Sequence, residues 1–358
     1  MQALHGERAA GAGYSIAHAI IMARHCDKRK SEMTMSRAVR LREFGPPEVM
    51  RIEQADLPDP GEGQARVRQT AIGFNFIDVY QRSGVYPLPL PTGLGHEAAG
   101  VVEAVGAGVR DLRPGDRVVY MNAGIGAYAD RRNVPAERLV ALPAAVSDED
   151  AAALFFKAMT AQYLLKKTHA VQPGDVLLVH AAAGGVGQIL VRWAKALGAF
   201  VVGTAGSPAK CEVARAAGCD AAIDYSRDDW PQALLQATGG RKARVVYDSV
   251  GRATFLKSLD CAAPFGLVVV YGGASGPAPA IEPEVLNKKG CLFLTRPSVF
   301  PHNADVTTFR ANAADVFAAI AAGHVRATIG ARFSLDEAPA AHRAAEARAT
   351  TGAILLVP

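Results

Sequence analysis

The fold of this chain is decided by residues 175–187, DVLLVHAAAGGVG. The apolar run from Val176 to Val179 predicts a buried strand, and the glycines after it predict a tight turn that opens a helix. Small residues let the backbone approach a ligand closely, and the backbone N–H groups at a helix start bind anions. The segment therefore predicts a loop that holds the pyrophosphate of a dinucleotide.

The flanking sequence completes a βαβ unit around this loop. A turn at Pro173-Gly174 leads into the strand, a helical pattern follows from Gln188 to Leu197, and a second apolar run begins at Phe200. Such a unit is about 30 residues long. The loop departs from the G-x-G-x-x-G pattern because Ala182 occupies the first glycine position. An ordinary turn of an α/β protein that binds no nucleotide is the alternative interpretation.

The end of the second strand indicates which dinucleotide binds. NAD sites place Asp or Glu about 20 residues after the glycines, where the carboxylate binds the ribose 2′-hydroxyl. Residues 203–210 contain no acid, but they contain Ser207 and Lys210. A 2′-phosphate would find donors and no repelling carboxylate there, so the segment predicts NADPH rather than NADH. A solvent-exposed lysine on a helix face is the alternative interpretation of Lys210.

Length and composition narrow the class of protein. The 358 residues suit two domains, and half of them are apolar. Because no apolar span reaches about 20 residues, we expect no membrane crossing. The net charge of +5 is spread along the chain without a basic, aromatic stretch, so no nucleic-acid partner is expected. Five scattered cysteines indicate neither a disulfide framework nor a four-cysteine zinc site, and they favour a cytoplasmic protein.

The first 34 residues differ from the rest of the chain. They lack clear periodicity, and the apolar stretch from Tyr14 to Met22 is short and has no cleavage site of the small-x-small kind after it. Residues 1–34 are therefore interpreted as a disordered extension or a start assigned too early.

From Met35 onward the pattern changes once, from β to alternating β and α. Up to about Ala144, short strand-like runs alternate with turn clusters, which predicts a β-rich domain. Ser147 is a candidate helix cap before an alanine-rich apolar run. Later strand-like runs separated by helical segments predict a doubly wound parallel sheet. The strand-like runs are Val39–Glu43, Ala65–Thr70, Ala98–Val105, Asp116–Tyr120, Val245–Asp248, Leu267–Tyr271, Cys291–Thr295 and Ile354–Val357.

Several motifs carry a resemblance to a known family. They are residues 71–87 (AIGFNFIDVYQRSGVYP), 93–100 (GLGHEAAG) and 181–187, extended by 246–251 (VYDSVG) and 295–298 (TRPS). In these motifs the chain resembles the zinc-free quinone oxidoreductase branch of the medium-chain dehydrogenase/reductase superfamily. These enzymes are zeta-crystallin-like, and the bacterial NADPH:quinone reductases are the most similar.

The resemblance implies two domains with a substrate cleft between them. A GroES-like catalytic domain would comprise residues 35–157 and 295–358, and a Rossmann domain that binds NADPH would comprise residues 158–294. The implied activity is the NADPH-dependent reduction of quinones by a homodimer.

The relatives that use zinc differ from this chain at their ligand positions. Their catalytic metal needs a cysteine near Asn75, a histidine in a G-H-E segment and a third soft ligand near Lys157. Here only His96 and Glu97 remain, and one imidazole with one carboxylate makes a poor zinc site. We therefore expect no metal and interpret His96 as a hydrogen-bonded structural histidine.

The resemblance also implies site residues, which fall into five groups. The pyrophosphate loop comprises Gly184, Gly185, Val186 and Gly187. The 2′-phosphate pocket comprises Gly206, Ser207, Lys210 and Tyr225, with Arg348 as a further cation. The nicotinamide-side loop carries Asn75, Phe76, Asp78 and Tyr80. The cofactor cleft is lined by Tyr163, Val250, Tyr271 and Ser298. For the substrate, Asn75 or Tyr80 can bond the carbonyl, and Tyr80 or Tyr86 can stack on a quinone ring.

Alternatives remain for the mechanism and for the function. Tyr80 is a candidate proton donor, although a half-buried packing tyrosine is the simpler interpretation. A second enzymatic hypothesis is reduction of an activated C=C bond in an enone or enoyl thioester, which needs stronger oxyanion stabilisation. A hypothesis of another class is a non-catalytic RNA-binding or crystallin-like protein, for which the sequence offers no basic, aromatic stripe.

Overall fold

The computed structural model describes residues 34–347 and 349–358. The chain divides into two units, Met1–Thr34 and Met35–Pro358, and the fold described here is that of the second. Residues 1–34 were interpreted as a disordered extension or a start assigned too early. Apart from Thr34, these residues lie outside the described part of the chain.

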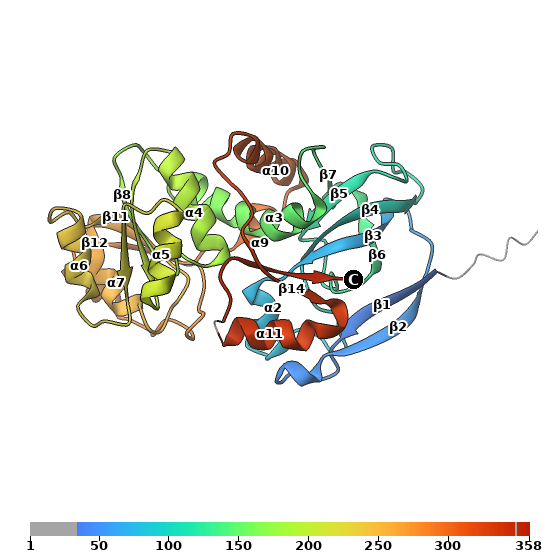
Figure 1. Ribbon diagram of the computed structural model, residues 1–358, viewed down its shortest axis with the longest axis horizontal. Helices are drawn as coiled ribbons and strands as arrows, with labels where there is room; N and C mark the ends of the chain where they lie inside the picture. Colours follow the sequence, from blue (N-terminus) through green and yellow to red (C-terminus); the bar gives the residue numbers. More distant parts are fainter. Residues whose placement is uncertain (1–33, 348) are drawn as a thin grey trace, which may run out of the picture. The chain divides into compact units, whose positions relative to one another are not determined.

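The first half of this unit is built on a mixed sheet that the end of the chain completes (Figure 1). Its strand order is β14-β15-β3-β4-β5-β7, and β6 pairs with the free side of β3 at the strand's start. The last strand, β15, runs antiparallel to β3, so residues near the C-terminus share a sheet with residues near 70. These strands are β3 (Gln64–Gly73), β4 (Glu97–Val105), β5 (Arg117–Met121), β6 (Arg131–Pro135), β7 (Leu139–Ala141), β14 (Ile329–Ser334) and β15 (Ala353–Val357).

A smaller ribbon and several short helices accompany this sheet. The strands β1 (Thr34–Arg40) and β2 (Arg51–Leu57) form a two-stranded sheet of their own. The predicted strand at Val39–Glu43 therefore lies further toward the N-terminus, as β1. The helices of this half are α2 (Phe76–Arg82), α11 (Ala338–Glu346) and the 3₁₀ turns η1 (Pro47–Val49), η2 (Ala136–Arg138) and η4 (Leu335–Glu337).

The second sheet is parallel throughout and confirms the predicted doubly wound architecture. Its order is β10-β9-β8-β11-β12-β13, which places the first strand, β8, beside the fourth, β11. From β8 the chain first adds strands on one side, β9 and β10, and then returns to add β11, β12 and β13 on the other side. The point between β8 and β11 is the topological switch point, where such folds bind their ligands. The strands are β8 (Val176–Val179), β9 (Phe200–Ala205), β10 (Ala221–Asp224), β11 (Ala243–Asp248), β12 (Ala262–Val270) and β13 (Phe293–Thr295).

Both faces of the parallel sheet are covered, which explains its continuous apolar strands. Leu177 and Val179 join a core with the helix α4, whereas Val176 and Leu178 pack on the other face with Trp230. Figure 1 shows helices on both sides of the sheet. These helices are α4 (Gly185–Ala196), α5 (Pro208–Ala216), α6 (Trp230–Ala237), α7 (Phe255–Cys261) and α8 (Pro283–Lys288).

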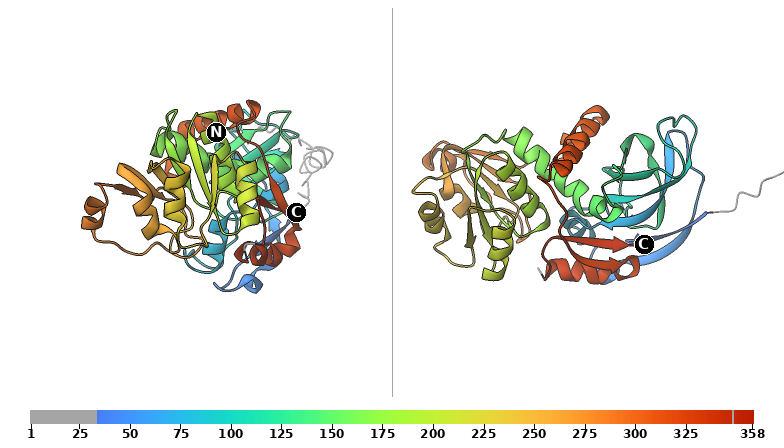
Figure 2. Two further views of the ribbon diagram at one scale, coloured as in Figure 1. Left: turned by 60° about the vertical axis from the view of Figure 1, so that its left-hand side comes forward. Right: turned by 45° about the horizontal axis from the view of Figure 1, so that its top comes forward.

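One long helix, α3 (Asp148–Tyr163), packs against strands of the mixed sheet on one side and against α4, a helix of the parallel-sheet half, on the other. The predicted cap is confirmed, because the Ser147 hydroxyl accepts the backbone N–H of Asp150. Nearly every later residue of α3 is buried, and the helix continues into a π-helical turn, η3 (Leu164–Thr168). The short α9 (Val299–His302) and the long α10 (Val306–Ala321) also pack on α3 (Figure 2). Side chains of α3 therefore lie between the mixed sheet and α4.

Candidate active site

Two adjoining cavities lie at the switch point of the parallel sheet. Their volumes are about 580 Å³ and 570 Å³. They adjoin, because both are lined by residues of the glycine-rich loop and of the loop that precedes α2. The shared lining residues are Asn75, Phe76, Ala181, Gly184, Gly185, Val186 and Ala274.

The glycine-rich loop leads into the uncapped N-terminus of α4 at the cavity wall. The helix begins at Gly185, and no side chain caps its first turn. The first N–H groups of a helix have no partner inside the helix, so this end can bind an anion. A Cβ on Gly187 would lie 2.2 Å from the backbone oxygen of Ala181, so only glycine allows this approach of helix and strand. The loop has the donors and the space that a pyrophosphate needs.

The alanine at the first glycine position is accommodated by a glycine elsewhere. Ala182 is fully buried, and its N–H donates to the carbonyl of Thr204 on the neighbouring strand β9. A Cβ on Gly203 would lie 2.7 Å from the Cβ of Ala182. Gly203 therefore supplies the room that the loop's own glycine supplies in the usual pattern.

The residues predicted to bind a 2′-phosphate lie together at the far end of the second cavity. Gly206, Ser207, Lys210 and Tyr225 all line it. The Ser207 hydroxyl caps α5 and accepts the N–H of Lys210, and the absence of a side chain at Gly206 leaves room beside the Tyr225 hydroxyl. Among the described residues that line this cavity none is acidic. The pocket can therefore hold a phosphate without charge repulsion.

Asn75 is held from two sides at the junction of the cavities. Its Nδ2 donates to Glu97 Oε1 over 2.8 Å, and its backbone N–H donates to Asp78 Oδ2 over 2.9 Å. Asp78 itself is fully buried and lines neither cavity. Burial raises the pKa of Asp78 to about 7, and the Tyr128 hydroxyl donates to the same carboxylate. The structure does not bring Asp78 to the cavity wall, and its contact with the site is through Asn75.

His96 occupies a structural position beside this junction. Its Nε2 lies 2.9 Å from Gln81 Oε1, and burial lowers its pKa to about 4, so the imidazole is neutral. The neighbouring Glu97 is bonded to Asn75 and to Lys157. Within residues 34–347 and 349–358, no group of three or more His, Cys, Asp or Glu side chains is arranged to hold a metal ion.

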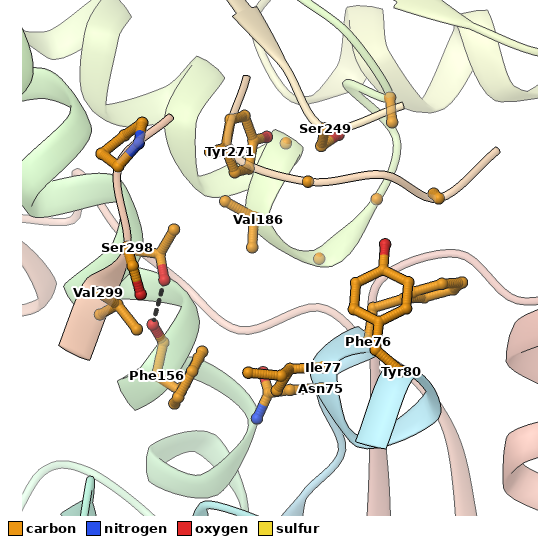
Figure 3. Close-up of a pocket in the computed structure, with 18 of the residues that line it drawn as sticks. Asn75, Phe76, Ile77, Tyr80, Phe156, Val186, Ser249, Tyr271, Ser298 and Val299 are labelled. Atoms are coloured by element: carbon orange, nitrogen blue, oxygen red, sulfur yellow. Dashed lines mark hydrogen bonds between the residues drawn. The ribbon is translucent and has the colours of Figure 1, made fainter. Parts of the chain in front are cut away.

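Aromatic side chains form one wall of the first cavity (Figure 3). The Tyr80 ring makes edge contacts with Phe76 and Tyr86, with centroids 5.2 Å and 5.1 Å apart. The Tyr80 hydroxyl accepts the N–H of Gly273 over 3.1 Å, and burial raises its pKa to about 12. Arg296 donates to the Tyr86 hydroxyl over 2.6 Å. This wall offers ring surfaces for a flat substrate and a protonated phenol for its oxygen.

Most predicted site residues line one of the two cavities. Tyr80, Tyr86, Tyr163, Gly187, Tyr271 and Ser298 line the first, Val250 lines the second, and Asn75 and the residues 184–186 line both. Arg348 lies outside the described residues.

Sequence reasoning missed lining residues that come from α3 and from the segment after β13. These are Phe156, Lys157 and Thr160 of α3, and Arg296 and Phe300. The sequence did contain a signal for Lys157, because it is the one charged residue in the apolar run from Ala151 to Leu165. Arg296 stood inside a quoted motif without being assigned a role.

Comparison with known proteins identifies the family. Residues 61–144 match the alcohol dehydrogenase GroES-like domain, and residues 185–313 match the zinc-binding dehydrogenase family. The chain is 44% identical to the quinone oxidoreductase of Pseudomonas aeruginosa, over 90% of this chain and 100% of that protein. It is also 44% identical to a 2-haloacrylate reductase of a Burkholderia species, over 88% of this chain and 96% of that protein.

Solved structures give the same result. The crystal structure of Escherichia coli quinone oxidoreductase complexed with NADPH matches with a TM-score of 0.87 and 44% identity, over 90% of this chain and 100% of that one. The crystal structure of a 2-haloacrylate reductase matches with a TM-score of 0.79 and 42% identity, over 90% of this chain and 99% of that one.

A GroES-like domain joined to a Rossmann domain, with a ligand site at the switch point, defines a medium-chain dehydrogenase/reductase, and this chain belongs to that superfamily. Within it, the chain belongs to the quinone oxidoreductase branch and is an oxidoreductase. In the described part of the chain, no helix is long and apolar enough to span a membrane.

Proposed function

We propose that this enzyme reduces quinones with NADPH and without a metal. The observation that carries the proposal is that two cavities adjoin at the glycine-rich loop: one contains a phosphate pocket without acidic residues, and the other is lined by aromatic rings. The similar Escherichia coli quinone oxidoreductase was crystallised with NADPH.

The residues present fit the cofactor along its length. The amides at residues 185–187 would hold the pyrophosphate, and Ser207, Lys210 and Tyr225 would hold the 2′-phosphate. Tyr163, Val250, Tyr271 and Ser298 would line the cleft around the rest of the dinucleotide. When bound there, NADPH would supply a hydride, which carries the two electrons and one of the two hydrogens that turn a quinone into a hydroquinone.

The side chains of the first cavity would orient the substrate and supply the remaining proton. A quinone that gains a hydride also takes up one proton to become a hydroquinone. Tyr80 keeps its proton at neutral pH, because burial raises its pKa to about 12, and it lies on the cavity wall. It can therefore donate a hydrogen bond or a proton to a quinone oxygen. The apolar walls exclude water from the reacting atoms.

The donor set argues against a catalytic zinc. The three positions where zinc-using relatives place ligands hold Asn75, His96 and Lys157. An amide and an ammonium group are poor zinc ligands, and His96 bonds Gln81. A quinone is already electrophilic, so its reduction does not require Lewis-acid polarisation of a carbonyl.

Steady-state oxidation of NADPH at 340 nm with 1,4-benzoquinone tests the proposal. We expect turnover with a kcat/KM for NADPH at least about 100-fold above that for NADH, because the 2′-phosphate gains charge-assisted hydrogen bonds. Absence of quinone turnover, or preference for NADH, would contradict it.

A second candidate function is reduction of an activated C=C bond that carries a carboxylate. The 44% identical 2-haloacrylate reductase motivates it. Arg296 is the one charged side chain among the described residues that line the first cavity, and it donates hydrogen bonds to the neutral Tyr86 hydroxyl and the Val270 carbonyl. Turnover of 2-chloroacrylate that exceeds turnover of benzoquinone would favour this function over the first.

We also infer the assembly, the domain limits and the compartment. The strand β13 forms one edge of the parallel sheet, and Phe265, Phe293 and Leu294 are exposed near that edge, which suits a homodimer. Light scattering of wild type and Phe293→Lys checks this, and a wild-type monomer would contradict it.

The two proposed domains comprise residues 35–157 with 295–358 and residues 158–294, and the first limit lies inside α3. The four described cysteines are free thiols, as in a cytoplasmic protein.

A further inference from the structure

A buried ion pair lies at the junction of the two cavities. Lys157 Nζ donates to Glu97 Oε1 over 3.2 Å, and the two side chains are 7% and 0% exposed. Glu97 also accepts the Nδ2 of Asn75 over 2.8 Å and the N–H of Phe156 over 2.6 Å. A buried pair recovers its desolvation penalty only when further hydrogen bonds satisfy both ions. The carboxylate is satisfied by these three donors, but the ammonium group is not.

The ammonium group lacks partners on the side that faces the cavity. Lys157 lines the second cavity, and within the described residues the hydrogen bond to Glu97 is the one that its Nζ makes. An ammonium group carries three donors, so two remain. Two unfilled donors on a buried cation at the wall of a cavity are what an anionic or hydroxyl-rich ligand would satisfy.

The stem of Lys157 fixes where along the cavity this cation lies. A Cβ built on Gly185 would lie 3.1 Å from Cδ and 3.3 Å from Cε of Lys157, so the stem packs against the first residue of α4. The ammonium group shares the Glu97 oxygen with Asn75, which lines both cavities. Lys157 therefore lies between the phosphate loop and the first cavity, whereas Lys210 lies at the opposite end of the second cavity with Ser207 and Tyr225.

We propose that Lys157 is a cofactor-binding residue that contacts the nicotinamide half of the dinucleotide, at its ribose or the adjoining phosphate, and that Glu97 positions it. The inference rests on the proposed function, because it requires a dinucleotide to cross the junction. NADPH and NADH share this half of the molecule, so Lys157 contributes affinity and Lys210 contributes discrimination. Glu97 links the two groups of the junction, because the same oxygen holds Lys157 and Asn75.

Binding of cofactor halves tests the assignment without any turnover. NADPH carries both halves, whereas adenosine 2′,5′-bisphosphate carries the adenosine half with its 2′-phosphate and one 5′-phosphate. We expect Lys157→Met to raise the Kd of NADPH about 10- to 100-fold, which corresponds to loss of one charge-assisted hydrogen bond. The Kd of the bisphosphate should stay within about twofold, and Lys157→Arg should recover part of the NADPH affinity.

Two further variants calibrate the comparison. Lys166→Met removes a lysine that pairs with Asp315 and lines neither cavity, so both Kd values should stay at the wild-type level. Lys210→Met should weaken the bisphosphate as much as NADPH. If Lys157→Met does not fold, Lys157→Gln, which keeps a donor for Glu97, is used in its place with the same expectation.

The outcomes separate the inference from the proposed function. Wild-type NADPH affinity in Lys157→Met, or equal weakening of both probes together with a lower melting temperature, would overturn the cofactor contact and leave a structural role. Wild-type protein that binds neither probe would overturn the proposed function itself.

Discussion

Replacing Gly187 by alanine perturbs the phosphate loop at its tightest point. A Cβ on Gly187 would lie 2.2 Å from the oxygen of Ala181 and 2.8 Å from the Cα of Ala182. Both are backbone atoms, so no side-chain rotation relieves the overlap. Because favourable non-bonded separations are about 3.5 Å, the first turn of α4 must retreat from the end of β8 by about 1 Å.

The expected losses follow from that displacement. Overpacking of this kind costs about 1–3 kcal/mol of stability. Moving the amides of α4 by about 1 Å should also weaken one or two charge-assisted hydrogen bonds to the pyrophosphate, at about 1.5–3 kcal/mol for each bond that is lost. We therefore expect the Kd of NADPH to rise at least about tenfold, measured by the fluorescence of the bound cofactor, together with a lower midpoint of urea unfolding.

A neighbouring glycine provides the control. A Cβ on Gly184 would lie 3.1 Å from the same oxygen of Ala181, and its φ of −77° suits any residue. Gly184→Ala should therefore raise the Kd less than about threefold. The reasoning is refuted if Gly187→Ala binds NADPH within threefold of wild type, or if Gly184→Ala loses as much affinity as Gly187→Ala.

Three other changes test the electrostatics and the chemistry of the site. Burial raises the pKa of Asp78 to about 7, whereas an unfolded aspartate titrates near 4, so stability should fall by about 4 kcal/mol as the pH rises from about 4 to about 7 and stay at that lower level above it. Asp78→Asn should abolish this fall in urea unfolding at pH 5 and 8; an unchanged pH dependence would contradict the assignment. Lys210→Glu should lower kcat/KM about 100-fold for NADPH and less than threefold for NADH, and a retained NADPH preference would remove Lys210 from the 2′-phosphate pocket. Tyr80→Phe, which keeps the ring contacts, should lower kcat with benzoquinone about tenfold or more at unchanged NADPH affinity, whereas unchanged kcat would leave Tyr80 a packing residue.

The parts of the fold that were predictable from the sequence are those with local signals. The strand from Val176 to Val179 and the cap at Ser147 are where the pattern placed them. The strands β2, β6, β7, β10 and β14 were not predicted, because most of their residues are partly or fully exposed and none forms a buried apolar run. The strand β12 begins at Ala262, earlier than its apolar run, where Pro264 and Phe265 are exposed.

The candidate site was predictable where a motif carries the residue and not where the tertiary fold brings it in. Loop residues such as Gly184 and Lys210 were placed by spacing. Asp78 was expected to contact the cofactor because the family resemblance includes it in the nicotinamide-side loop, but the capping box of α2 turns its carboxylate to the Asn75 backbone. Lys157 stands out as a charged residue in an apolar run, but its place in the site depends on the packing of α3 between the mixed sheet and α4, which the sequence pattern does not show.

Single-turnover reduction in the presence of a chelator tests the central claim most directly. Enzyme treated with EDTA and loaded with NADPH is mixed rapidly with 1,4-benzoquinone, and the absorbance at 340 nm is followed. We expect NADPH to be oxidised at the rate of the untreated enzyme, and we expect NADH at the same concentration to support little reaction. Loss of the reaction with EDTA and its recovery with zinc, or equal rates with the two cofactors, would contradict the account.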